Sequence, residues 1–287
     1  MSGRGLATKT LDLIAVCHAI LEVEQPLTVR GVCYRLFNRK LIPDMGKNST
    51  ARVSSILTTA RERDMIPWDW LVDETREIDY TPSWDDPTEF MESVEDQYRK
   101  DRWAFQPHRV FLVSEKGTVG GILRPVIAYY GVPFAVYHGF GSASAVNLLA
   151  RISASDHRPL TLLYVGDHDP SGRYMSDVDL PGRIDRSGGR ATMERVALMR
   201  SDLDDLAPMT FRAEDKKTDS RYPWFIDNHG DTCCELDALD ANELRERVKN
   251  AIVRHLDVAA WKQAGATEDA EIGSIRDFFA TWKSDAA

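Results

Sequence analysis

The sequence lacks the cysteine patterns of secreted or zinc-binding proteins. It has four cysteines in 287 residues, with neither C-x-x-C spacing nor a histidine partner at metal-ligand spacing. Structural zinc and a disulfide framework are therefore not expected. The sequence also lacks any apolar run near the roughly 20 residues of a membrane-spanning helix. No small-residue cleavage site follows its first apolar stretch. We therefore expect a cytoplasmic protein without a membrane partner.

A nucleotide-binding loop of the P-loop type is missing as well. The segment GKNST, which begins at Gly46, has no glycine at the required upstream position. No internal repeat or low-complexity tract is present. The 43% hydrophobic content is ordinary for a globular protein, and 287 residues suffice for two modest domains or one large one.

Acidic residues outnumber basic residues, and the two kinds are unevenly distributed along the chain. The formal net charge of -9 excludes a protein that coats DNA indiscriminately, because phosphate binding requires Lys and Arg on the surface. Residues 28–63 nevertheless carry eight basic and two acidic side chains, whereas residues 64–101 carry three basic and thirteen acidic ones. This polarity suits a localised nucleic-acid-binding face near the N-terminus. An unevenly charged, solvated surface is the alternative.

The N-terminal part has the pattern of a small helical DNA-binding domain. Apolar residues recur at helical spacing over residues 10–21, 29–37 and 49–63. Thr28 is suited to cap the second of these helices, and the segment IPWDWLV at 66–72 is typical of extended chain. Three short helices followed by a strand predict a winged helix-turn-helix domain over residues 1–80, whose third helix would enter the major groove.

A different pattern follows an acidic segment. Residues 81–104 are rich in Asp, Glu and Pro, which predicts a connector. Beyond it, short apolar runs alternate with helical segments, which predicts an α/β domain with a parallel sheet over residues 105–287. The expected strands span residues 109–114, 132–137 and 160–165, and the expected helices span residues 122–130, 143–152 and 242–255.

Three carboxylates follow two of the predicted strands. Glu115 comes directly after the first strand, and Asp167 and Asp169 follow the third. Ligands bind at the carboxyl ends of parallel strands, so one ion could reach all three acids. Mg²⁺ prefers a few protein oxygens together with water and phosphate oxygens. The sequence therefore predicts a Mg²⁺ site, which Mn²⁺ could also fill. The alternative is that these acids cap helices or meet solvent.

The motifs around these acids resemble a known family. VSEKG contains Glu115, GDHDPSG contains Asp167 and Asp169, HGFGSASAV lies between them, and CELDALDANEL follows. Together they are similar to the Toprim domain of the topoisomerase VI A subunit and its meiotic double-strand-break relatives. TVRGVCYRLF is similar to the Arg-x-x-x-Tyr helix of that family. The resemblance covers about residues 10–256, and the short chain is most like the compact, stand-alone mini-A type.

The resemblance implies a mechanism for cutting DNA. Tyr34 would attack DNA and form a 5′-phosphotyrosyl bond, Arg30 would hold a phosphate, and Glu115 would act beside the metal. One tyrosine breaks one strand, so the family implies a homodimer in which each tyrosine faces the metal site of its partner. Topoisomerase activity would further need a separate ATPase (B-type) subunit. One departure is Cys33, which stands where the family often has the first of two tyrosines.

Three other functions remain open on the sequence alone. A Toprim nuclease would keep the metal site but use activated water instead of Tyr34. A regulatory DNA-binding protein would bind without cutting. A dinucleotide-binding enzyme is suggested by the glycines at 139 and 141, which follow a strand and precede a helix. In the first two cases, as in the leading one, the protein would bind double-stranded DNA and be associated with the nucleoid.

Overall fold

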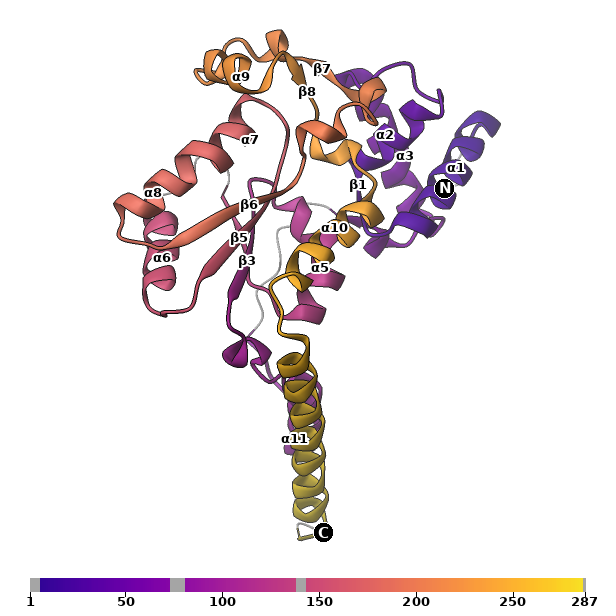
Figure 1. Cartoon of the computed structure of the whole chain (residues 1–287). Helices are drawn as coiled ribbons and strands as arrows, with labels where there is room; N and C mark the ends of the chain where they lie inside the picture. The colour runs from indigo at the N-terminus through magenta and orange to yellow at the C-terminus, as the bar shows by residue number, and fades with distance from the viewer. Residues whose placement is uncertain (1–5, 73–80, 138–142, 286–287) are drawn as a thin grey trace.

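Residues 6–72, 81–137 and 143–285 are described by a computed structural model of mixed α/β type (Figure 1). A four-stranded parallel sheet lies at its centre, with helices on both faces. The predicted α/β class with a parallel sheet is therefore confirmed.

Three helices open the chain, as their periodicity predicts: α1 (Thr8–Glu24), α2 (Val29–Asn38) and α3 (Lys47–Glu62). Thr28 caps α2, because its hydroxyl accepts a hydrogen bond of 2.8 Å from the backbone N–H of Gly31. This bond satisfies one of the free N–H groups of the first helical turn. The three helices pack on one another and form one side of a larger core.

The extended segment expected at residues 66–72 is wrong for most of its length. Trp68–Trp70 form a 3₁₀ helix, and only β2 (Leu71–Val72) is a strand. Pro67 holds the φ angle that such a turn needs, and its carbonyl accepts from the N–H of Trp70. Trp68 is consequently 57% exposed rather than packed. β2 pairs in parallel with β1 (Leu27–Thr28).

The central sheet has the order β4-β3-β5-β6, and every pairing is parallel. Three strands were expected, and all three are present. The fourth strand was not expected, because Glu194 and Arg195 interrupt its apolar pattern. The elements in chain order are β3 (Arg109–Ser114), α5 (Thr118–Tyr130), β4 (Phe134–Val136), α6 (Ala143–Ala154), β5 (Leu160–Val165), α7 (Pro170–Tyr174), a π-helical turn (Met175–Asp179), α8 (Leu180–Arg186) and β6 (Ala191–Ala197).

A small cap covers the carboxyl ends of the strands. Figure 1 shows α9, β7 and β8 beyond that end of the sheet, and His168 joins the cap through backbone bonds of 2.9 Å to Cys234. The cap and the following helix comprise β7 (Phe211–Arg212), a 3₁₀ turn (Ala213–Lys216), α9 (Tyr222–His229), β8 (Thr232–Cys233), a second 3₁₀ turn (Leu236–Ala238) and α10 (Ala241–Val253).

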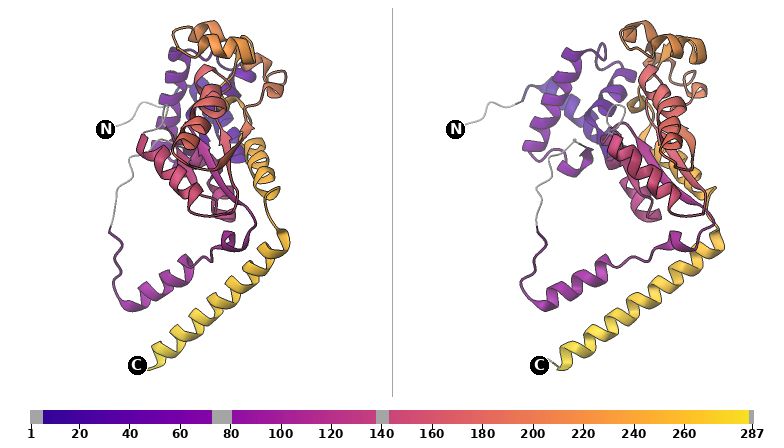
Figure 2. Two further views of the ribbon diagram at one scale, coloured as in Figure 1. Left: turned by 60° about the vertical axis from the view of Figure 1, so that its left-hand side comes forward. Right: turned by 90° about the vertical axis from the view of Figure 1, so that its left-hand side faces the viewer.

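A helical arm extends away from the sheet (Figure 2). It consists of the long α11 (Val258–Asp285) and of α4 (Pro87–Gln97), which packs along it. Arg276 pairs with Glu95, and the Tyr98 hydroxyl donates to Glu271 at 2.6 Å. The acidic segment 81–104 thus contributes a helix to this arm. In the described residues we find no helix with the length and apolarity to cross a membrane.

The N-terminal helices share their core with the sheet. One apolar cluster runs from α1, α2 and α3 into the face of the sheet covered by α5 and α10, while a second cluster lies under α6 and α8. Arg35 of α2 donates to the carbonyls of Leu239 and Ala238 at 2.8 and 3.2 Å. Arg245 of α10 donates to the carbonyl of Pro26 at 2.9 Å. These bonds join the two regions firmly.

Candidate active site

The three predicted acids lie at one edge of the sheet. Glu115 directly follows β3, and Asp167 and Asp169 follow β5. β3 and β5 are neighbours whose last residues, Ser114 and Val165, are paired. Parallel strands end at the same edge, so the topology brings the acids to one place, as the sequence predicts.

Gly172 lets the acids approach one another. Asp169 caps α7 by accepting from the N–H of Gly172 at 2.7 Å. A Cβ atom on Gly172 would lie 2.5 Å from the carbonyl oxygen of Asp167 and 3.0 Å from Oε1 of Glu115. No side chain fits in that space. The glycine therefore allows the turn that carries both aspartates to close against the Glu115 carboxylate.

Lysines pair with both aspartates. Lys116 Nζ lies 2.8 Å from Oδ1 of Asp167 and 3.1 Å from Oδ2 of Asp237. Lys216 forms an ion pair with Asp169. Asp167 also accepts from the N–H of Leu236 at 2.8 Å. The buried carboxylates are thus compensated by two ammonium groups.

Burial and the repulsion between neighbouring carboxylates raise the pKa of Glu115 and of Asp167. Burial, together with the charges of Asp167 and Asp169, raises the pKa of Glu115 from 4.5 to about 7. Burial likewise raises the pKa of Asp167, although Lys116 opposes the effect. Carboxyl groups shifted in this direction gain from a nearby cation.

This donor set fits a divalent cation of the Mg²⁺ type. All three candidate ligands are carboxylates, the oxygen donors that Mg²⁺ prefers. Burial raises the pKa of Glu115, and a nearby cation would favour its ionised form. Within residues 6–72, 81–137 and 143–285, no group of three or more His, Cys, Asp or Glu side chains is already arranged to hold a metal. Metal binding would require at least Lys216 to move from Asp169.

Arg195 on β6 supports the acidic turn and was missed by the sequence reasoning. Its buried guanidinium donates to the carbonyls of Gly166, Asp167, Gly172 and Leu198, and to the Ser176 hydroxyl. A single arginine thus holds the backbone on both sides of the two aspartates. No local sequence pattern identifies such a residue, because all of its partners except Leu198 are about 20 to 30 residues away in the chain.

Tyr34 lies on α2, outside the cluster of the three acids. Its side chain is buried, and the Arg30 guanidinium lies 5.8 Å from the centre of its ring. Arg30 is bound to Glu235 by two hydrogen bonds, one of them 2.6 Å long. Burial and the charge of Glu235 raise the pKa of Tyr34, and Arg30 opposes this shift. In this state Tyr34 is a protonated phenol at neutral pH.

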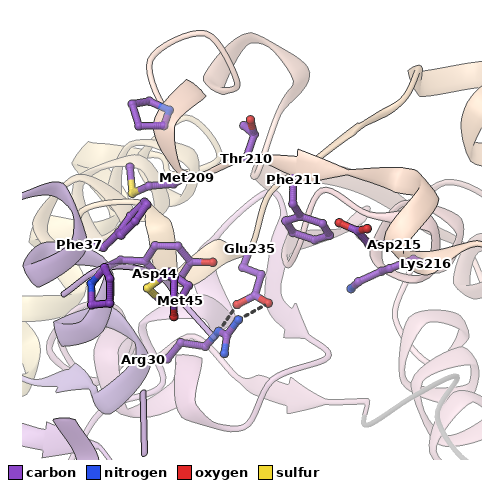
Figure 3. A pocket seen from close by; sticks show the side chains of 13 residues that line it. Arg30, Phe37, Asp44, Met45, Met209, Thr210, Phe211, Asp215, Lys216 and Glu235 are labelled. Carbon is purple, nitrogen blue, oxygen red and sulfur yellow. Dashed lines mark hydrogen bonds and ion pairs between the residues drawn. The ribbon is translucent and has the colours of Figure 1, made fainter. Parts of the chain in front are cut away.

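A cavity of about 410 Å³ is lined by both Tyr34 and Lys216, but not by Glu115, Asp167 or Asp169. Figure 3 shows Phe37, Asp44 and Met45 on one side, Phe211, Asp215 and Lys216 on the other, and the Arg30–Glu235 pair between them. Tyr34 also lines this cavity. Since Lys216 is the partner of Asp169, one side chain belongs to both the cavity and the acidic cluster.

The N-terminal helices present a basic surface. Two of the eight basic residues between 28 and 63 are buried, and Arg30 is paired with Glu235. The other five are exposed: Arg39, Lys40, Lys47, Arg52 and Arg63. Along α3, the exposed positions before Glu62 carry no acid. This face suits contact with a phosphate backbone.

The glycine-containing turn and His168 also belong to the predicted motifs. The glycines at 139 and 141 lie in segment 138–142, which is outside the described residues, and α6 begins at Ala143. His168, between the two aspartates, is fully buried, with its ring 5.5 Å from that of Phe225. Burial lowers the pKa of His168 to about 3, so it is neutral and packs in the cap.

Comparison with known proteins identifies no relative: neither the protein-family models nor the curated proteins contain a match to this chain. The resemblance to topoisomerase VI A subunits therefore remains a prediction that rests on the quoted motifs.

Proposed function

We propose that this protein cleaves DNA by transesterification, as topoisomerase VI A-like proteins of the mini-A type do, with Tyr34 as the nucleophile. The observation that carries the proposal is the shared position of Lys216, which pairs with Asp169 and lines the cavity of Tyr34 and Arg30. A nucleophile, a phosphate-binding arginine and a carboxylate cluster are the components that such a reaction needs.

In the proposed reaction, the Tyr34 oxygen bonds to the phosphorus of a DNA phosphodiester. The bond from phosphorus to the 3′ oxygen breaks, which leaves a 5′-phosphotyrosyl end and a 3′ hydroxyl. The phenol proton leaves Tyr34, and a proton is returned to the 3′ oxygen. Glu235, which lines the same cavity, would accept the phenol proton, and Arg30 would stabilise the negative charge on the phosphate.

Glu115, Asp167 and Asp169 would hold the Mg²⁺ ion. When bound, the ion would supply Lewis-acid stabilisation of charge at the phosphate and the leaving oxygen. Arg195 keeps the turn of the two aspartates in place through its bonds to Gly166 and Asp167. The Toprim assignment of residues 105–287 is part of this proposal.

DNA would be held by the N-terminal helices. The exposed basic side chains on and around α3 would contact phosphates, and α3 would enter the major groove as in winged-helix proteins. Because each chain carries one Tyr34, we propose that a homodimer cuts both strands. Any strand-passing activity would require the separate ATPase subunit.

The test is to trap the covalent intermediate. DNA labelled at its 3′ end or internally is incubated with protein and Mg²⁺, and the reaction is stopped with denaturant. We expect protein attached to 5′ ends with the unchanged chain, and none with Tyr34→Phe or Asp167→Ala. Cleavage by Tyr34→Phe at the normal rate would eliminate the tyrosine mechanism.

A mixed dimer identifies which metal site serves each tyrosine. One chain carries Tyr34→Phe and the other carries Asp167→Ala. If Tyr34 uses the acids of the partner, as the family resemblance implies, one complete site remains and one strand is cut. If each chain uses its own acids, neither site is complete and no strand is cut.

The second candidate function is a Toprim nuclease that uses activated water. It is favoured by the pKa of about 7 for Glu115, which suits a general base at neutral pH. In that case Tyr34→Phe would cut DNA normally without a trapped adduct. Binding to DNA without Mg²⁺-dependent cutting, unaffected by Asp167→Ala, would instead identify a regulatory DNA-binding protein.

A further inference from the structure

Lys216 connects two parts of the proposed active site. It ends the 3₁₀ turn that follows β7, and it pairs with Asp169, whose side chain is only 4% exposed. The Lys216 side chain is 35% exposed and lines the cavity of Tyr34. Its ammonium also lies 5.5 Å from the centre of the Phe211 ring, which forms part of the cavity wall. Lys216 therefore has polar and aromatic surroundings on the cavity side as well as a carboxylate.

The two lysines of the cluster are held differently. Lys116 bridges Asp167 and Asp237, so two carboxylates retain it, and its side chain is 24% exposed. Within the described residues, Lys216 forms an ion pair with one carboxylate, and it is the more exposed of the two lysines. A buried carboxylate must keep a cation nearby, but nothing requires that cation to be Lys216.

We propose that Lys216 is a displaceable counter-cation, which occupies Asp169 in the absence of metal and moves to the Tyr34 cavity when Asp169 binds a divalent cation. This inference rests on the proposed function. The ammonium and the divalent cation compete for the same carboxylate, so Lys216 weakens metal binding in the free protein. Once released, Lys216 adds to Arg30 a second positive charge in the cavity, where it can bind the DNA phosphate.

Removing Lys216 should change the affinity for metal in a direction that depends on the role of this lysine. If Lys216 only stabilised the site, its removal would weaken metal binding or leave it unchanged. If it competes with metal, its removal leaves Asp169 uncompensated, and the affinity for metal rises. The expected gain is about two- to fivefold, as for a partly exposed ion pair.

The experiment measures Mn²⁺ binding to the full chain without DNA by isothermal titration calorimetry. Lys216→Met is the test variant, Lys216→Arg retains the competing charge, and Lys217→Met is the matched control, because Lys217 is the exposed neighbour. We expect tighter binding for Lys216→Met alone, with the other two variants close to the unchanged chain. Equal or weaker binding by Lys216→Met would overturn the proposal.

A second measurement tests the role in the cavity. At saturating Mg²⁺, Lys216→Met should form the covalent DNA adduct at least about tenfold more slowly than Lys217→Met, although it binds metal more tightly. An unchanged rate would refute the movement into the cavity. The two failures are distinguishable: if the unchanged chain binds no Mn²⁺, the proposed metal-dependent function fails too, whereas Mn²⁺ binding without a gain in Lys216→Met overturns this inference alone.

Discussion

Replacing Glu115 by Gln should stabilise the metal-free protein at high pH. The pKa of this carboxyl is raised from 4.5 to about 7 by burial and by the two aspartates. The folded protein therefore holds a proton on Glu115 that the unfolded chain has already released. Below about pH 4.5 both states are protonated and Glu115 costs nothing. As pH rises from about 4.5 to 7 the free energy of unfolding falls, and above pH 7 the full penalty is present.

The size of the effect follows from the same pKa. Each pKa unit corresponds to about 1.4 kcal/mol, so the raised pKa corresponds to a penalty of about 3 kcal/mol. Glu115→Gln removes the charge but keeps the shape of the side chain. We expect the variant to gain up to about 3 kcal/mol over the unchanged chain at pH 8 and close to none at pH 4.

The assay is urea unfolding at several pH values with a chelator present. Glu214→Gln is the control, because Glu214 is an exposed carboxylate in the cap, and it should change stability little at any pH. Mg²⁺ should stabilise the unchanged chain at pH 8 but not Glu115→Gln. The reasoning is refuted if Glu115→Gln has the same stability as the unchanged chain at pH 8, or a lower one.

Three further substitutions test the supports of the site. Gly172→Ala places a Cβ 2.5 Å from the Asp167 carbonyl, and should cost about 1–3 kcal/mol and weaken Mn²⁺ binding in calorimetry, whereas Gly182→Ala meets only a flexible arginine side chain and should do neither. Arg195→Lys removes most of the guanidinium hydrogen bonds that hold the turn of the two aspartates and should cost about 3 kcal/mol in urea unfolding, unlike Arg190→Lys at an exposed position. Thr28→Ala removes the cap of α2 and should cost about 1 kcal/mol, while Thr28→Ser retains it; equal losses would show that the hydroxyl is not responsible.

The sequence predicted correctly those features that depend on residues close together in the chain. The strands at 109–114 and 160–165 are short runs rich in Val, Phe and Leu. The acids that follow them lie at one edge of the sheet because neighbouring parallel strands end there. The cap of α2 by Thr28 was likewise readable from one residue and its neighbours. These predictions required no knowledge of distant contacts.

The remaining features depend on partners far away in the chain. Lys216 reaches Asp169 across 47 residues, and Arg195 reaches Asp167 across 28. β6 was missed because Glu194 and Arg195 form such distant contacts: Glu194 accepts from both Arg254 and His255, and Arg195 binds the turn of Asp167 and Asp169. Trp68 and Trp70 gave a strand-like alternation that Pro67 converts into a 3₁₀ turn. Hydrophobic periodicity alone reveals neither the strand β6 nor the 3₁₀ turn at Trp68–Trp70.

The core that α1, α2 and α3 share with the sheet packs the basic face and the acids into one unit. Swinging the helices outward would break the bonds from Arg35 to the segment at 238–239 and from Arg245 to Pro26. It would also expose apolar surface at about 25 cal/mol per Å², against a typical folding stability of about 5–15 kcal/mol. If the proposed homodimer cuts both strands, we expect the two cut DNA ends to part by separation of the two chains rather than by movement within one chain.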